Sequence, residues 1–248
     1  TNIIKAVTTD DKEEIVELFN RYDLLSLPVV DLENRLVGIV TVDDAVSVME
    51  EEVTEDFEKM AAMTPSEKPY LKTNVFILAK NRITWLLVLM FSSMITGGIL
   101  SRYEEQIAAL PLLVTFIPML TDTGGNAGSQ SSTMVIRGMA IGEVEIGDAL
   151  KIIWKEFRVS IIVGLILAGV NFIKVVLQYP GQYDVGLTVG LSLFCTVTMA
   201  NIVGGLLPVL AKKLNIDPTI MASPLISTLV DAMSLMIFFG LAVGILHV

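Results

Sequence analysis

The sequence predicts a mainly α-helical membrane protein with five transmembrane helices, preceded by a partial α/β domain and an acidic connecting helix. The 248 residues are 53% apolar and the mean hydropathy is +0.67, well above the values of a soluble domain. The opening stretch, in contrast, is charged and ordinary in composition. We therefore expect a partial domain at 1–49, an acidic helix and linker at 50–79, and a five-helix transmembrane domain at 80–248.

The opening region alternates between helix and strand signals. Residues 11–22 predict a helix, Ser26–Val30 a strand, Leu32–Asn34 a turn and Arg35–Val40 a second strand, after which Thr41 caps a new helix. The first thirty residues contain no apolar segment typical of a signal peptide, so the N-terminus is expected to stay in the cytoplasm.

An acidic segment follows, in which eight acids between Asp43 and Lys59 face a single base within a chain of net charge −10. Such a segment repels nucleic acid and attracts cations, so no nucleic-acid partner is expected. A solvated helix face is the simpler interpretation, but the position directly before a membrane domain favours a cation-sensing role. The candidate sensing residues are Asp43, Asp44, Glu50, Glu51, Glu55, Asp56 and Glu58.

The remaining chain contains five apolar segments long enough to cross a bilayer. Their predicted bounds are Ile83–Leu100, Gln106–Ile136, Val159–Ile173, Val185–Ala211 and Pro218–Val248. With a cytoplasmic N-terminus, most basic residues of the connections fall on the inner side, as the positive-inside rule requires. We therefore expect a multi-pass protein of the cytoplasmic membrane with its C-terminus outside.

The second segment is interrupted by a dense run of polar and small residues from Thr121 to Thr133. Lipid cannot form hydrogen bonds with these groups, so the run must face protein or water. Its glycines suit close helix packing or local unwinding, but packing alone does not explain so many amides and hydroxyls. A polar pore wall explains them, and Asp122 adds an acid to it.

Asp231 is the only formal charge between Pro218 and Leu246 and falls near the middle of the last segment. An acid at that depth costs about 2.5–3.5 kcal/mol, and such residues usually mark ion paths, proton relays or catalytic centres. Ser223 and Ser227 precede it at intervals of four residues, so all three share one helix face. Pro224 is expected to loosen this helix and free backbone carbonyls.

Several blocks of this region resemble the MgtE-type magnesium channels. They are Thr123–Gln130 with Val135–Gly138, Ala200–Gly204, Leu207–Pro208 through Asp217–Pro218, and Ser223–Leu225 with Leu229–Asp231. The resemblance implies a homodimer of five-helix protomers in the lipid bilayer, with a pore for Mg²⁺ between the second and fifth helices of the two copies.

The same resemblance assigns roles to residues. Asp231 becomes the main acid facing the pore ion, and the polar groups that support it are Asn126, Ser129, Thr133, Ser223 and the backbone carbonyl of Ser227. Ser129 and Ser223 depart from the longer amide side chains often found in that family. Mg²⁺ keeps most of its water when bound by few carboxylates, which suits one acid from each protomer.

Leu27–Asp31 followed by Gly38–Asp44 looks like the second half of a CBS pair. In that family Thr41 and Asp44 can contact a nucleotide, although a helix cap is the interpretation favoured here. Because a pair is normally needed, an upstream portion is expected to be missing. The resemblance also implies that cytoplasmic Mg²⁺, as a regulatory ligand, bridges the acidic helix to the CBS domain and closes the pore.

Two other functions are compatible with these residues. A secondary transporter of another divalent cation, such as Mn²⁺, Co²⁺ or Ca²⁺, would use the same acids. An intramembrane aspartyl protease would pair Asp122 with Asp231, but neither acid lies in a sequence motif of those proteases. The expected protein is therefore a transporter and not an enzyme.

Overall fold

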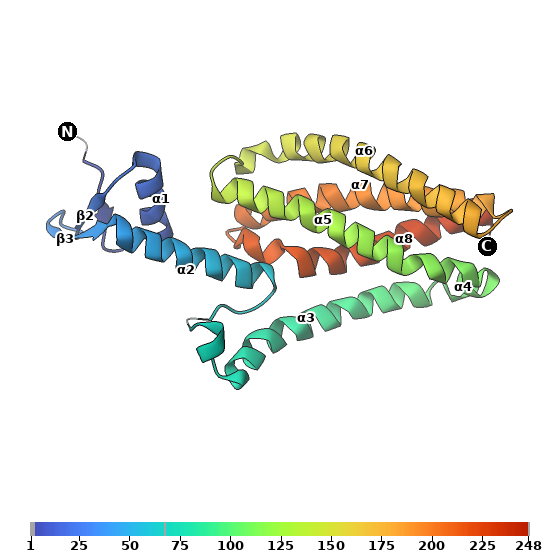
Figure 1. The fold of residues 1–248 in the computed structure, drawn as a ribbon, viewed down its shortest axis with the longest axis horizontal. Coiled ribbons are helices and arrows are strands. Elements are labelled where there is room, and N and C mark those ends of the chain that lie inside the picture. Colours follow the sequence, from blue (N-terminus) through green and yellow to red (C-terminus); the bar gives the residue numbers. More distant parts are fainter. Residues whose placement is uncertain (1–2, 67, 248) are drawn as a thin grey trace. The chain divides into compact units, whose positions relative to one another are not determined.

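The structure, a computed structural model, describes residues 3–66 and 68–247. It divides into two compact units, residues 1–58 and 59–248, which are described separately. Figure 1 shows the helices and strands of both. In chain order these are β1 (Ala6–Val7), α1 (Lys12–Tyr22), β2 (Ser26–Val30), β3 (Leu36–Thr41), α2 (Val42–Met60), η1 (Tyr70–Lys72), α3 (Val75–Ser101), α4 (Glu104–Ala109), η2 (Pro111–Phe116), α5 (Ile117–Ala140), η3 (Ile146–Asp148), α6 (Ala149–Gln178), α7 (Tyr183–Lys213), η4 (Pro218–Met221) and α8 (Ser223–Leu246).

The first unit is a three-stranded sheet with two helices. β1 pairs with β2 in parallel and β2 with β3 in the antiparallel sense. Asp11 caps α1 because its side chain accepts a hydrogen bond from the backbone of Glu13. The small core of this unit contains Ala6, Val16, Phe19, Leu27 and Ala45. The helix and strands predicted here are confirmed to within a residue or two.

The last helix of the first unit, α2, is continuous over 19 residues. Just before the helix begins, Asp44 Oδ2 accepts hydrogen bonds from the backbone N–H of Thr41 at 3.3 Å and from its Oγ1 at 2.7 Å, and the backbone bond is one half of a capping box. The acidic residues expected on a separate connecting helix therefore lie on the same helix that starts at the sheet, and the predicted boundary at 49/50 falls inside it. The three-part division of the chain stays a prediction.

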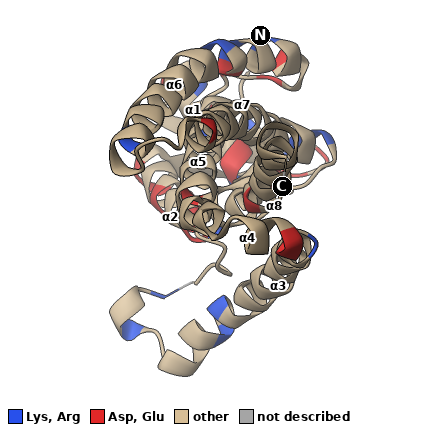
Figure 2. Cartoon of the chain, turned by 90° about the vertical axis from the view of Figure 1, so that its right-hand side faces the viewer, with Lys and Arg blue, Asp and Glu red and all other residues tan. Residues whose placement is uncertain are grey.

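The second unit is a helical bundle in which α7 contacts α5, α6 and α8. Because α6 and α7 run antiparallel, Gly205 of α7 lies beside Ile152 of α6, and Gly186 lies beside Phe172. The main core is formed by apolar residues of η2, α5, α6, α7 and α8, among them Leu120, Val189, Val197, Phe238 and Phe239. α3 packs chiefly on α8, and none of its residues is fully buried. Figure 2 views this bundle along its helices and shows basic residues near the Val75 end of α3.

Among residues 3–66 and 68–247, four stretches are long and apolar enough to span a membrane. They are α3, η3 with α6, α7 and α8. The 24-residue α5 has the length but not the apolar composition, because its middle is polar. The predicted mainly helical membrane fold is thus confirmed with four such helices, and the fifth, α5, remains a proposal.

Two predictions about helix continuity were wrong. The segment Gln106–Ile136 is not one helix, because the chain breaks at Leu110 and Pro111 into α4, η2 and α5. Pro224 does not loosen a helix interior, since α8 begins only at Ser223 and places the proline in its first turn. A proline there costs nothing, because the missing N–H would have no helical partner.

Candidate functional site

The two sides of α5 have opposite character. Gly124, Gly125 and Gly128 are buried where α5 meets its neighbours. A Cβ built on Gly124 would lie 2.6 Å from Thr196 of α7 and 2.8 Å from Val230 of α8. One built on Gly204 of α7 would overlap the carbonyl oxygen of Gly128. These glycines therefore allow close helix approach within a regular helix, and α5 is not unwound here.

Buried hydroxyls reinforce this closed side. Ser131 Oγ donates to the carbonyl oxygen of Asn201 on α7 at 2.9 Å, and Ser132 Oγ donates to that of Met221 at 2.8 Å. Both serines are at most 5% exposed. Two of the six hydroxyls in the polar run thus serve packing, and the sequence pattern did not separate these two from the rest.

The open side of α5 carries the predicted pore residues. Asp122, Asn126 and Thr133 are exposed and Ser129 is half-buried. Their spacing of four, three and four residues places them along one stripe of the helix. The structure therefore brings all four onto one polar face of α5, most of which the other described residues leave uncovered.

α8 meets this face at its first two turns. Ser129 Oγ donates to Ser223 Oγ at 3.0 Å. One turn later, a Cβ built on Gly125 would lie 3.0 Å from Ser227 Oγ, so the helices are in contact there. Ser223 and Ser227 are therefore placed beside α5.

Asp231 lies one turn beyond Ser227 and is partly exposed. Asp122 of α5 is close enough for the two carboxylates to repel each other. Among the described residues, no three acid, histidine or cysteine side chains form a group that could hold a metal ion. One chain thus offers two carboxylates with hydroxyl and amide neighbours, which suits a cation that keeps its water.

A further acid stands at the end of the bundle where α8 begins. Asp217 accepts hydrogen bonds from the backbone and the hydroxyl of Thr219, at 2.9 and 2.6 Å. Lys59 Nζ lies 2.7 Å from its other carboxylate oxygen. Burial raises the pKa of Asp217, but the hydrogen bonds from Lys59 and Thr219 outweigh it and leave the pKa below its ordinary value. The sequence pattern did not predict this pair, whose members are 158 residues apart.

The predicted sensing acids all lie on α2, and the structure pairs some of the acids there with α1. Lys12 Nζ lies 2.7 Å from Glu52 and 3.8 Å from Glu51. A hydrogen bond with Glu52 and partial burial raise the pKa of Glu13 to about 7, which indicates two carboxyl groups sharing a proton. The other candidates are Asp43, Asp44, Glu50, Glu55, Asp56 and Glu58, and their sensing role stays a prediction.

A bundle of long apolar helices with a polar, acid-bearing face is typical of multi-pass membrane transport proteins. The family model "MgtE: Divalent cation transporter" matches residues 117–241, and a CBS domain model matches residues 1–51. The chain belongs to the MgtE family of divalent cation transporters, as the resemblance predicted. This family is one of transporters, so the protease alternative is not supported.

Three curated relatives are similar over almost the whole chain, and each is described as a magnesium transporter MgtE. That of Bacillus subtilis is 38% identical over 100% of this chain, that of Thermus thermophilus 38% over 97%, and that of Enterococcus faecalis 32% over 97%. The chain covers 54%, 53% and 52% of their respective lengths, so it spans about half of the relatives it matches.

Proposed function

We propose that this chain transports Mg²⁺ across the cytoplasmic membrane, through a pore formed where two copies meet and with Asp231 as the main acid facing the ion. The observation that carries the proposal is the polar face of α5 and α8, which carries two acids on the open side of the helical bundle. The names of the three relatives support Mg²⁺ as the ion.

The need to cover this face supports the second copy. In a single chain, lipid would contact the exposed side chains of Asp122, Asn126 and Thr133. Lipid tails cannot form hydrogen bonds with these polar groups. A two-fold related copy would place the same polar stripe opposite and enclose a water-lined passage. The two Asp231 side chains would then share the charge of one hydrated cation.

The chemistry of the lining favours a cation that is not stripped of water. Mg²⁺ is usually bound by one or two carboxylates and several retained waters. The hydroxyl and amide groups of Ser129, Asn126 and Thr133 are short and suit contact with that water shell. Ser223 and the carbonyl of Ser227 complete the proposed lining. A carrier for Mn²⁺, Co²⁺ or Ca²⁺ is the second candidate, because the same acids would serve it.

The decisive experiment measures Mg²⁺ flux into proteoliposomes that contain the chain, its Asp231→Ala variant and an Asp184→Ala control. Asp184 is an exposed acid in the first turn of α7, away from the polar face. We expect Asp231→Ala to lower Mg²⁺ flux about 10- to 100-fold, the usual loss for a group that supports a bound metal, and the control to keep it. Repeating the assay with Mn²⁺, Co²⁺ and Ca²⁺ separates Mg²⁺ transport from the second candidate function, transport of another divalent cation.

Circular dichroism and size-exclusion chromatography establish that the Asp231→Ala variant is folded. Flux equal to that of the original chain in a folded variant would remove Asp231 from the pore. Crosslinking of cysteines introduced on the open side of α5, at Asn126 or Thr133, tests the dimer directly.

The proposed regulation rests on the acids of α2. In this proposal, binding of cytoplasmic Mg²⁺ near these acids closes the pore. Replacing Glu50, Glu51, Glu55, Asp56 and Glu58 by the matching amides should shift inhibition by internal Mg²⁺ to higher concentration, while Asp43 and Asp44 are tested separately because Asp44 caps α2. An unchanged inhibition curve would remove α2 from gating. Nucleotide binding at Thr41 and Asp44 is a weaker possibility, since the two side chains bond each other.

A further inference from the structure

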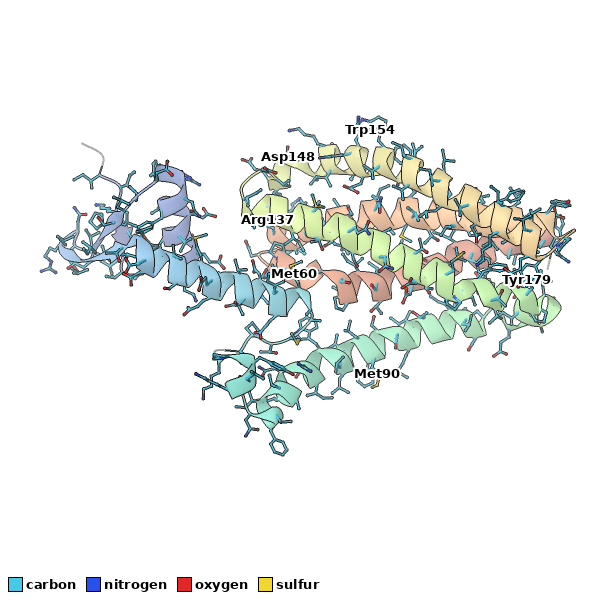
Figure 3. The ribbon with its side chains drawn as sticks, viewed as in Figure 1. Met60, Met90, Arg137, Asp148, Trp154 and Tyr179 are labelled. Carbon is cyan, nitrogen blue, oxygen red and sulfur yellow. The ribbon has the colours of Figure 1, made fainter. Side chains whose placement is uncertain are left out.

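One side of the first three turns of α6 is basic and aromatic. Lys151, Lys155 and Arg158 are spaced by four and three residues, so they lie along one face of the helix, and all three are exposed. Trp154 lies between them and is 58% exposed. Figure 3 shows Trp154 pointing away from the bundle, and the other helices leave this side of α6 uncovered.

The acids near these turns do not neutralise the basic face. Glu156 lies on the opposite side of the helix, where a Cβ built on Gly205 of α7 would approach it at 3.2 Å. Asp148 forms an ion pair with Lys151 at 2.6 Å. Among the described residues, no ion pair is found for Lys155 or Arg158, so at least two positive charges on this face remain available.

Aromatic contacts hold the arrangement in place. The guanidinium carbon of Arg158 lies 5.7 Å from the centre of the Trp154 ring, and its Nε donates to the Trp154 carbonyl oxygen at 3.4 Å. The Phe157 ring lies 5.9 Å from that of Trp154, with 26° between their planes. Arg158 is thus held beside an exposed indole, and the indole presents both an apolar face and an N–H group.

The depth of this face in the bilayer follows from the length of α6. The helix has 30 residues, about 45 Å at 1.5 Å per residue, whereas the hydrocarbon core is roughly 30 Å thick. The charge-free stretch starts at Val159, so Arg158 and Trp154 lie at the edge of the apolar layer. Tryptophan concentrates at this level in membrane proteins, and lysine and arginine there meet lipid phosphates.

We propose that Lys151, Lys155, Arg158 and Trp154 form a binding site for the headgroup of an anionic phospholipid. The phosphate would lie between Lys155 and Arg158, and the Trp154 ring would pack on the glycerol backbone. Ile162 extends the same side of the helix into the apolar layer, is 64% exposed, and offers apolar contact to the lipid. A free phosphate ion would interact only with the basic side chains, because it has no apolar part to pack against Trp154 and its apolar neighbours.

The test uses the whole chain with Trp85→Phe, which leaves Trp154 as the only tryptophan. It is placed in vesicles that mix phosphatidylcholine with phosphatidylglycerol, and in two matched series either lipid carries bromine, which quenches tryptophan fluorescence on contact. The ratio of quenching gives the preference of the Trp154 surroundings for one lipid over the other. We expect a preference of at least about fivefold for phosphatidylglycerol, because a single basic residue at the membrane surface already provides that much and two are available here.

Replacing Lys155 and Arg158 by glutamine in this background should reduce the preference to about one, because the charges that hold the phosphate are gone. The matched control replaces Lys212 and Lys213, two basic residues at the end of α7, and should leave the preference unchanged. Equal quenching by both lipids in the original chain, or a preference that survives the Lys155 and Arg158 replacements, would overturn the proposal. So would loss of the preference with millimolar inorganic phosphate at constant ionic strength, because the site would then bind a free anion.

Discussion

The closed and open sides of α5 use the same polar residue types for opposite purposes. On the closed side, Ser131 and Ser132 bond to backbone carbonyls, and Gly128 lies against Gly204 of α7. On the open side, Asp122 and Asn126 are exposed. The comparison teaches that a polar stretch in a membrane helix needs sorting by face before a pore is assigned to it.

The largest effect on stability is expected at the closest contact between α5 and α7, on the closed side of α5. Gly204→Ala puts a methyl group into the carbonyl oxygen of Gly128, which should destabilise the bundle by about 1–3 kcal/mol or more. Gly240→Ala on α8 is the matched control, since nothing lies within 4 Å of its Cβ position. That change should stabilise the helix by roughly 0.8–1 kcal/mol. Unfolding in mixed detergent measures both, and equal stabilities would mean that the contact between α5 and α7 is loose.

A smaller effect separates two serines only two positions apart. Ser131→Ala removes a buried hydrogen bond to α7 and should lower the free energy of unfolding by about 1 kcal/mol. Ser129→Ala, on the open side, breaks only the contact with Ser223 and should change stability by less than about 0.5 kcal/mol. The same detergent titration compares them. A reversed order of the two values would show that the faces have been assigned wrongly.

The smallest expected effect is a change in Mg²⁺ flux, and it concerns Asp122 on the open side of α5. Asp122→Asn removes the charge that repels Asp231 but leaves the proposed main acid in place. Mg²⁺ flux should fall roughly two- to fivefold, as for a charge acting through water, and the fall should shrink at high salt. A loss as large as that of Asp231→Ala would make Asp122 a full partner in binding the ion.

Much of this architecture could be predicted from local patterns. The strand at Ser26–Val30 and the helix after Asp11 follow from alternation and capping, and both are observed. The shared face of Ser223, Ser227 and Asp231 follows from helix periodicity alone. The family also follows, because short motifs recur in the same order along the chain.

What the pattern missed depends on context that a single segment does not carry. A proline breaks a helix in its interior but is favoured in its first turn, so the positions of Pro111 and Pro224 could be interpreted either way. The Lys59–Asp217 pair joins residues 158 positions apart, and no periodicity links them. The division of serines between packing and the open face was also hidden, because it depends on where α7 lies.

The contact between Gly128 and Gly204 has a mechanical consequence. Because no side chain separates these two glycines, the backbones of α5 and α7 are in direct contact. The hydrogen bond from Ser131 to the carbonyl oxygen of Asn201 also fixes the position of one helix along the other. The two helices are therefore expected to move together as one rigid body. Any motion that widens or narrows a passage beside Asp122 then has to come from elements outside this pair, such as α3, none of whose residues is fully buried.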